Sequence, residues 1–187
     1  MSEEKSNRLI LGKSTLVRFS FLNVFRPVES EEDGEKKSFY QTSVLIPKSS
    51  KADIAAFNEH VKAVIDAEFK GKSTNLKLPL RDGDEEWEEK GAAYKDHYFF
   101  NCKSKHKPDV VGTKRDEFTG DLAALGQDEI KSGDHGRIAV TFYAFEGKQK
   151  GIAVGLGNVQ KVRDGEPLGN QRAANDDFGD IEDGFSD

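Results

Sequence analysis

Alternation of hydrophobic and polar residues is the feature that most constrains the fold of this chain. In residues 15–21, Val17, Phe19 and Phe21 alternate with polar residues, which is typical of a half-buried β-strand. Alternating or β-rich sequence predicts four further strands, at residues 38–46, 97–104, 135–145 and 151–162. The short glycine-containing loop 146–150 predicts that the last two form a hairpin. The chain is therefore expected to fold mainly around β-sheet.

One segment has helical spacing instead. Ser50 and Asp53 have roughly the spacing of a capping box, and Gly71 is suited to end a helix. The hydrophobic residues between them are Ile54, Phe57, Val61, Val64, Ile65 and Phe69. This pattern predicts a helix over residues 51–70.

The remaining segments are polar and contain glycine or proline. Residues 23–35 and 72–91 are predicted to be irregular loops, and short helical turns are expected near 122–125. Five strands, large loops and a long helix between the second and third strands favour a five-stranded Greek-key barrel of the OB type. A generic α+β sandwich is the alternative. We predict one domain over residues 1–164 and a flexible acidic tail over 165–187.

The predicted strand at 97–104 has two chemically different faces. Alternation places Tyr98, Phe100 and Cys102 on the core side. The other side presents His97, Phe99, Asn101, Lys103 and Lys105. Proteins that bind single-stranded nucleic acid combine rings, on which bases stack, with cations that follow the phosphates. The pattern therefore indicates a binding face, although an ordinary solvated strand has the same composition.

Other segments offer similar residues. Residues 135–145 place Ile138, Val140 and Phe142 inward, and basic or aromatic residues outward. The predicted DNA-binding set is Arg18, Phe99, Asn101, Lys103, Lys105, Lys107, Lys114, Arg115, Arg137 and Tyr143. In this set Phe99 and Tyr143 would stack on bases, and the cations would neutralise phosphates.

The formal net charge of −6 does not argue against this interpretation, because the acids are unevenly distributed. Residues 173–187 contain six acids and neither Lys nor Arg, and removing those six from 34 leaves 28 acids against 28 bases. A further eleven acids lie in the two predicted loops, so the rest of the body has 17 acids against 28 bases. The strands and their connections are therefore net basic.

The acidic tail also contains isolated hydrophobic residues. A short acidic, glycine-bearing segment cannot bury itself, so we expect disorder. The predicted partner-binding residues are Asp176, Asp177, Phe178, Asp180, Ile181, Glu182, Asp183, Phe185 and Asp187. They suit a motif that docks in a basic, apolar pocket of a replication protein such as a polymerase, helicase or primase. The alternative is a tail that only aids solubility.

Two other functions were weighed. Asp109, Glu129 and Lys131 fit a loose nuclease pattern in which two carboxylates and a lysine hold Mg²⁺ and a water molecule. An acidic module that mimics DNA is the second. His97, Cys102 and His106 lack a fourth ligand at zinc-finger spacing, and Gly155-x-Gly157 lacks the lysine of a phosphate-binding loop. We therefore predict a protein without catalytic activity, metal or cofactor.

Three segments resemble a phage and prophage family of single-stranded DNA-binding proteins, which is often known only as a domain of unknown function. They are Leu-Pro-Leu-Arg-Asp-Gly-Asp from Leu78, Tyr-Phe-Phe-Asn-Cys-Lys-Ser-Lys from Tyr98, and Gly-Ile-Ala-Val-Gly-Leu-Gly-Asn-Val-Gln-Lys-Val-Arg-Asp-Gly-Glu-Pro-Leu from Gly151. The resemblance runs from about Thr15 to the tail.

The resemblance implies an OB-type fold, coating of replication intermediates without catalysis, strand annealing and often a homodimer. It also implies an acidic tail that ends in an aromatic residue and contacts replication proteins. Here Ser186 and Asp187 follow Phe185, so a pocket that reads the ring and the terminal carboxylate together would fit poorly. The chain has a single cysteine, a polar N-terminus and no apolar run of membrane-spanning length, so we expect the host bacterial cytoplasm and no membrane partner.

Overall fold

The computed structural model describes residues 7–32 and 34–168. The predicted tail residues, from Asp176 to Asp187, lie outside the described residues, so their role remains a prediction.

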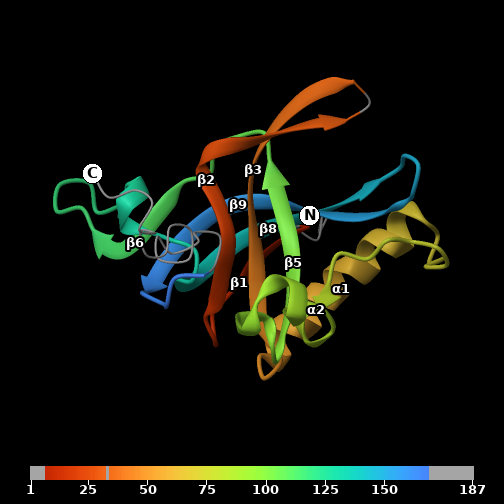
Figure 1. The fold of residues 1–187 in the computed structure, drawn as a ribbon, viewed down its shortest axis with the longest axis horizontal. Coiled ribbons are helices and arrows are strands. Elements are labelled where there is room, and N and C mark those ends of the chain that lie inside the picture. The colour runs from red at the N-terminus through yellow and green to blue at the C-terminus, as the bar shows by residue number, and fades with distance from the viewer. Residues whose placement is uncertain (1–6, 33, 169–187) are drawn as a thin grey trace, which may run out of the picture.

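Five strands close a barrel, as predicted (Figure 1). They are β2 (Val17–Glu32), β3 (Glu35–Pro47), β5 (His97–Ser104), β8 (His135–Phe145) and β9 (Gly151–Arg163). The order is β2-β3-β5-β9-β8, and β8 pairs with β2 to complete the circuit. The β5–β9 pair is parallel, whereas the other pairs in the circuit are antiparallel. This Greek-key order confirms the predicted OB-type barrel and excludes the sandwich.

The core fills the barrel and continues under the long helix. Phe19, Val44, Phe100, Phe142 and Val154 are almost completely buried, one from each of the five strands. Alternation along the strands therefore identified the inward-facing side of the barrel.

The helix α1 (Lys51–Glu68) closes one end of the barrel, within two residues of the predicted bounds. The Phe57 ring centroid lies 4.9 Å from those of Phe100 and Phe142. The predicted capping box is wrong, because in the described part of the chain the Ser50 side chain makes no cap. Asp53 is buried and its carboxylate accepts a hydrogen bond from the Gly12 backbone N–H at 3.0 Å. The carboxylate thus ties the turn before β2 to the helix.

Residues 23–35 are not the irregular loop that was predicted. β2 and β3 continue through this segment as a two-stranded arm that projects from the barrel (Figure 1). Glu31 pairs with Lys36, and Ser30 pairs with Lys37. Cross-strand pairing of opposite charges stabilises an acidic strand that composition alone marks as a loop.

Residues 72–91 are also more regular than predicted. They include the short strand β4 (Arg81–Asp82) and the helix α2 (Gly83–Lys90), followed by the 3₁₀ turn η1 (Ala92–Tyr94). Lys48 Nζ lies 2.8 Å from Asp82 and 2.7 Å from Asp84, which fastens the start of α2 to the end of β3. A Cβ at Gly83 would lie 2.1 Å from the Tyr94 carbonyl oxygen, so the close approach of α2 and η1 requires glycine.

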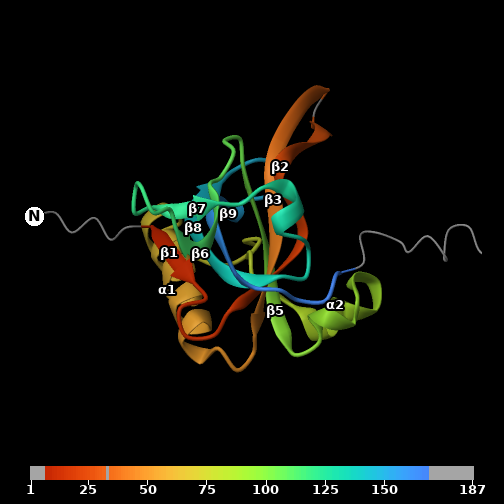
Figure 2. The ribbon, with the colours of Figure 1, turned by 90° about the vertical axis from the view of Figure 1, so that its left-hand side faces the viewer.

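Three more strands extend the sheet beyond the barrel (Figure 2). β1 (Arg8–Leu11) pairs with β8, while β6 (Val110–Arg115) pairs with β9 and β7 (Leu122–Ala124) with β6. β7 replaces the helical turns predicted near 122–125, because its residues gain a strand partner that local sequence does not reveal. η2 (Gln127–Glu129) follows β7.

The described residues after β9 stay against the barrel. The buried Asp134 carboxylate accepts a hydrogen bond from the Gly165 N–H at 3.0 Å, and Leu168 N–H donates to the Ser132 carbonyl at 3.1 Å. Contacts with the barrel thus continue to Leu168, beyond the predicted domain boundary at residue 164. The division into a domain and a flexible tail stays a prediction. In the part of the chain that the structure describes, no helix is long and apolar enough to span a membrane.

Candidate nucleic-acid interface

A row of paired residues crosses the outer surface of the barrel. Asn23 on β2 pairs with Gln41 on β3, and Gln41 pairs with Lys103 on β5. Lys103 pairs with Gly155 on β9, which pairs with Thr141 on β8. Paired residues share a face of the sheet, so these side chains belong to one outer row. We call the surface around it the β5 face.

A second row lies beside the first. Ser20, Ser43 and Asn101 are paired across β2, β3 and β5, and the Ser43 hydroxyl donates to the Asn101 side-chain carbonyl. On the other side of β5, Tyr143 pairs with Ala153, two residues before Gly155. The register thus brings three predicted residues, Asn101, Lys103 and Tyr143, onto a single face.

Cations lie over aromatic rings at the edge of this face. Lys103 Nζ is 4.4 Å from the centroid of the Phe39 ring, and Lys107 Nζ is 5.7 Å from that of Phe25. Lys90, at the end of α2, lies 6.0 Å from the centroid of Phe21, whose side chain is 36% exposed. Ammonium groups poised over rings offer a phosphate contact and a stacking surface together.

The β2 backbone is distorted where it reaches this face. Phe21 has φ of 50°, and a register shift separates Ser20 from Asn23. A positive φ is unfavourable for a bulky residue, at a cost of about 1–3 kcal/mol. The Leu22 N–H is held by the Ser132 hydroxyl at 3.0 Å, which helps to fix the distortion. The bulge turns the Phe21 ring outward.

The predicted role of Phe99 in stacking is wrong. Phe99 does lie on the outer side of β5, but none of its surface is exposed. It forms a small cluster with Leu45 and Tyr94, in which the Tyr94 ring packs edge-on at 5.0 Å. The α2–η1 segment covers this end of β5, so both sides of the strand are buried there.

Arg18 is engaged within the protein. Its Nε donates to the Gly133 carbonyl at 2.9 Å, and its Nη2 donates to the Glu166 carbonyl at 2.8 Å. Both contacts hold backbone segments together. The predicted contact between Arg18 and phosphate therefore competes with a structural role.

The other predicted cations fall in three places. Lys105 and Lys107 are exposed beyond the end of β5, and Lys107 lies over the Phe25 ring. Lys114 is exposed on β6. Arg115 and Arg137 line a different groove of about 740 Å³. The predicted set is thus not one cluster.

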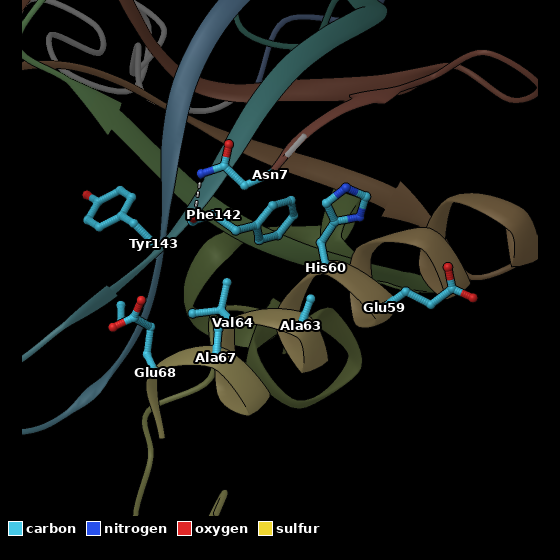
Figure 3. A pocket seen from close by; sticks show the side chains of 10 residues that line it. Asn7, Glu59, His60, Ala63, Val64, Ala67, Glu68, Phe142 and Tyr143 are labelled. Atoms are coloured by element: carbon cyan, nitrogen blue, oxygen red, sulfur yellow. Dashed lines mark hydrogen bonds between the residues drawn. The ribbon is translucent and has the colours of Figure 1, made fainter. Parts of the chain in front are cut away.

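A third surface hollow lies between α1 and β8 (Figure 3). It has a volume of about 890 Å³ and is lined by small apolar residues of α1, by Phe142, and by Glu59 and Glu68. Its described lining residues include neither Lys nor Arg, so it does not suit a phosphate backbone. Phe142 points toward His60, and Tyr143, which points away from Phe142, also lines the hollow (Figure 3).

The nuclease residues are not assembled into a site. Glu129 accepts the Gly126 N–H at 2.9 Å, and Lys131 Nζ is 2.7 Å from Asp134, while Asp109 lies at the start of β6. Within the described residues, no group of three or more His, Cys, Asp or Glu side chains could hold a metal ion. Cys102 also faces the core, and burial raises the pKa of its thiol well above the ordinary value.

Sequence reasoning missed Phe21, Phe25, Phe39, Gln41 and Lys90 as members of the face. A signal for two of them was present, because Phe39 and Gln41 alternate with the core-facing Tyr40 and Thr42. Lys90 could not be found locally, since only the fold of α2 brings it beside Phe21.

A closed OB-type barrel with rings and cations on its outer face is typical of proteins that bind single-stranded nucleic acid. Comparison of the sequence with known families identifies the family of the chain. The profile of the family of the Enterobacter phage Enc34 ssDNA-binding protein matches residues 7–186, and the chain belongs to that family. The family resemblance is confirmed, and the family is named for a DNA-binding protein, in agreement with the predicted absence of catalysis.

Individual relatives agree with this assignment. The putative protein p50 of Acyrthosiphon pisum secondary endosymbiont phage 1 is 29% identical over 177 residues, covering 88% of this chain and 90% of that protein. The single-stranded DNA-binding protein of bacteriophage Enc34 in complex with ssDNA has a TM-score of 0.73 at 22% identity, over 87% of this chain and 90% of that one. Another structure of the Enc34 protein has a TM-score of 0.70 at 20% identity, over 93% and 90%. These structures support the fold.

Proposed function

We propose that this chain binds single-stranded DNA along the β5 face without sequence preference. The row through Gln41, Lys103 and Thr141, flanked by exposed rings, is the observation that carries the proposal. Lys103, Lys105 and Lys107 neutralise phosphates, and Phe39, Phe21 and Tyr143 offer stacking surfaces. Stacking tolerates any base because every base has an aromatic face.

The two ends of the β5 face carry opposite charges, acidic at α2 and basic at the end of β5. The acids Asp84, Glu85, Glu88 and Glu89 are exposed on α2 beyond the buried Phe99. They repel phosphates, so the strand ends its contact near Lys90 rather than continuing over α2. The basic end lies at Lys105 and Lys107, next to the β2–β3 arm.

We further propose that the chain acts in phage DNA replication and recombination in the host bacterial cytoplasm, as a homodimer. The acidic tail recruits a replication protein and competes with DNA for the β5 face. Three things support this role of the tail: the concentration of acids in 173–187, the hydrophobic residues among them, and the basic character of the face. The interspersed rings distinguish a docking motif from a tail that only adds charge.

A binding titration tests the proposal. Fluorescence anisotropy with labelled oligo-dT, at two salt concentrations, should give binding at micromolar concentration or tighter. The log–log dependence on salt should have a slope of about −0.7 for each phosphate neutralised. Lys103→Gln should reduce the slope by about 0.7, whereas Lys62→Gln on α1 should leave it unchanged. Binding that is absent, or that ignores salt, would overturn the proposal.

A further inference from the structure

A second basic groove lies on the outer side of the same sheet. β1 and β6 border it, and β8 and β9 form its floor. We call it the β1–β6 groove, and its volume is about 740 Å³. Figure 2 shows β1, β6, β7 and β8 gathered on one side of the barrel. Its charged lining residues are Arg8, Lys13, Arg115, Arg137, Asp109 and Asp121.

The charges of this groove favour an anion. Four of its lining side chains are cationic and two are anionic. Arg115 uses one nitrogen to hold the Gly120 carbonyl at 2.8 Å, and Arg137 donates from Nε to the Gly12 carbonyl at 3.3 Å. Each contact takes one of the five N–H donors of a guanidinium, so donors remain on both. Fixed guanidinium groups of this kind suit phosphate oxygens.

The groove is continuous with the β5 face. Arg137 pairs with Gln160, and Gln160 pairs with Val111 on β6, which gives an outer row across the groove. Thr141, which belongs to the row through Lys103, lies four residues from Arg137 on β8. At a strand rise of about 3.3 Å per residue, the two rows are about 13 Å apart.

Small residues lie between the two rows. Ala139 on β8 and Gly157 on β9 have no side chain beyond Cβ, and Ala139 is 4% exposed. A Cβ at Gly155 would lie 2.4 Å from Thr141 Oγ1, and one at Gly157 would lie 2.6 Å from the Ala139 carbonyl oxygen. The close approach of β8 and β9 therefore requires glycine at both positions.

We propose that the β1–β6 groove binds the phosphate backbone of the same DNA strand after it leaves the β5 face. This inference rests on the proposed function and extends it. The strand crosses the floor of small residues and places phosphates between Lys13, Arg115 and Arg137. The 13 Å step corresponds to roughly four nucleotides at the duplex rise of about 3.4 Å, and to fewer in a stretched strand.

The test compares a short and a long oligonucleotide, because only the long one can cover the whole β5 face and the groove at the same time. Oligo-dT of about 5 and about 16 nucleotides spans the range of sites on OB folds. The variants are Lys13→Gln and the double variant Lys13→Gln/Arg115→Gln, with Lys62→Gln as the matched control. Circular dichroism and thermal unfolding confirm that each variant folds, and Lys13 is exposed in a turn, where substitution is tolerated.

The expected result is a length-dependent loss. For the long oligonucleotide, the double variant lowers the magnitude of the salt slope by about 1.4, and Lys13→Gln alone by about 0.7. For the short oligonucleotide neither variant changes affinity, whereas Lys103→Gln weakens binding of both. Equal effects on both lengths, or none on either, would overturn the inference. Failure of wild-type protein to bind either oligonucleotide would instead overturn the proposed function.

Discussion

Lys103 Nζ lies 4.4 Å from the centroid of the Phe39 ring, on neighbouring strands of the barrel. The pair places a positive charge directly beside a half-buried aromatic surface. A nucleotide bound there would bring its phosphate and its base to two groups already held in position, which lowers the ordering cost of binding.

Replacing Phe39 with alanine should weaken binding of oligo-dT. Loss of one stacked base costs about 1–3 kcal/mol, or roughly 5- to 150-fold in affinity. Anisotropy titration measures the change. Phe39→Trp is the matched control, since it keeps an aromatic face and should retain most of the affinity. Equal weakening in both variants would show that packing rather than stacking matters at this position.

Gly155→Ala should disturb the outer row that contains Lys103 and Thr141. The added Cβ would lie 2.4 Å from Thr141 Oγ1 and 3.6 Å from Tyr143 Cε1, so Thr141 has to move. We expect a lower melting temperature and weaker DNA binding. Thr141→Ala in the same chain removes the contact and should restore much of the stability. A double-mutant cycle without coupling would contradict this explanation.

Tyr94→Phe should loosen the cover over Phe99. The Tyr94 hydroxyl donates to Ser20 Oγ at 2.9 Å in a buried position. Loss of this bond leaves Ser20 without that donor and should cost about 1 kcal/mol in urea unfolding. Tyr94→Phe/Ser20→Ala removes both partners and should cost less than the sum of the single changes. Strict additivity would mean that the hydrogen bond contributes little.

Asp134 should make stability sensitive to acid. Burial alone would raise the pKa of its carboxyl, but hydrogen bonds from Lys131, Gly165 and Lys161 outweigh it and hold the pKa below the ordinary 3.8. A depressed pKa stabilises the fold above pH 3.8, and the contribution is lost as pH falls through the folded value. We therefore expect a steep acid limb in the unfolding free energy.

Asp134→Asn tests that linkage. It should lower stability at pH 7 by about 2 kcal/mol, because hydrogen bonds to a charged group are lost. It should also flatten the acid limb, as measured by urea unfolding from pH 2 to pH 7. The control is Asp164→Asn, since the Asp164 side chain is 79% exposed and should contribute little. An unchanged acid limb in Asp134→Asn would contradict the assignment.

Removing residues 173–187 should tighten binding of oligo-dT at low salt, because the acidic segment no longer competes for the β5 face. A second variant with its six acids changed to Asn or Gln tests charge at constant length. Both variants should bind oligo-dT with similarly increased affinity. Binding to the replication partner should be lost in each variant that alters the docking motif. Unchanged affinity in both would count against competition.

The sequence predicted the barrel well because each barrel strand has a clear inner side. The β5 bounds were predicted without error, and α1 within two residues. The arm at 23–35 was missed because its stability comes from cross-strand pairs such as Glu31 with Lys36, which local composition cannot reveal. Acidic residues with Pro27 and Gly34 look like a loop until a partner strand is known.

The binding face was only partly predictable. Alternation correctly placed Phe99 and Lys103 on the same side of β5, but it says nothing about what covers that side. The helix α2 lies over Phe99 and leaves Lys103 accessible, and α2 belongs to a segment predicted to be irregular. Arg137 was predicted to face outward and Arg115 to lie in a basic loop, yet only the pairing of β8, β9 and β6 shows that they border a separate groove.

The buried thiol of Cys102 has a practical consequence. It is 1% exposed, burial raises the pKa of its thiol, and it is the single cysteine of the chain. Maleimide reagents need an accessible thiolate, so the native protein should stay unlabelled until the barrel opens. Cysteines introduced one at a time at exposed positions, such as 13 or 105, would then be the sites that react. Protection of each by bound DNA would trace the strand across the molecule, and the slow reaction of Cys102 itself would report the rate of barrel opening.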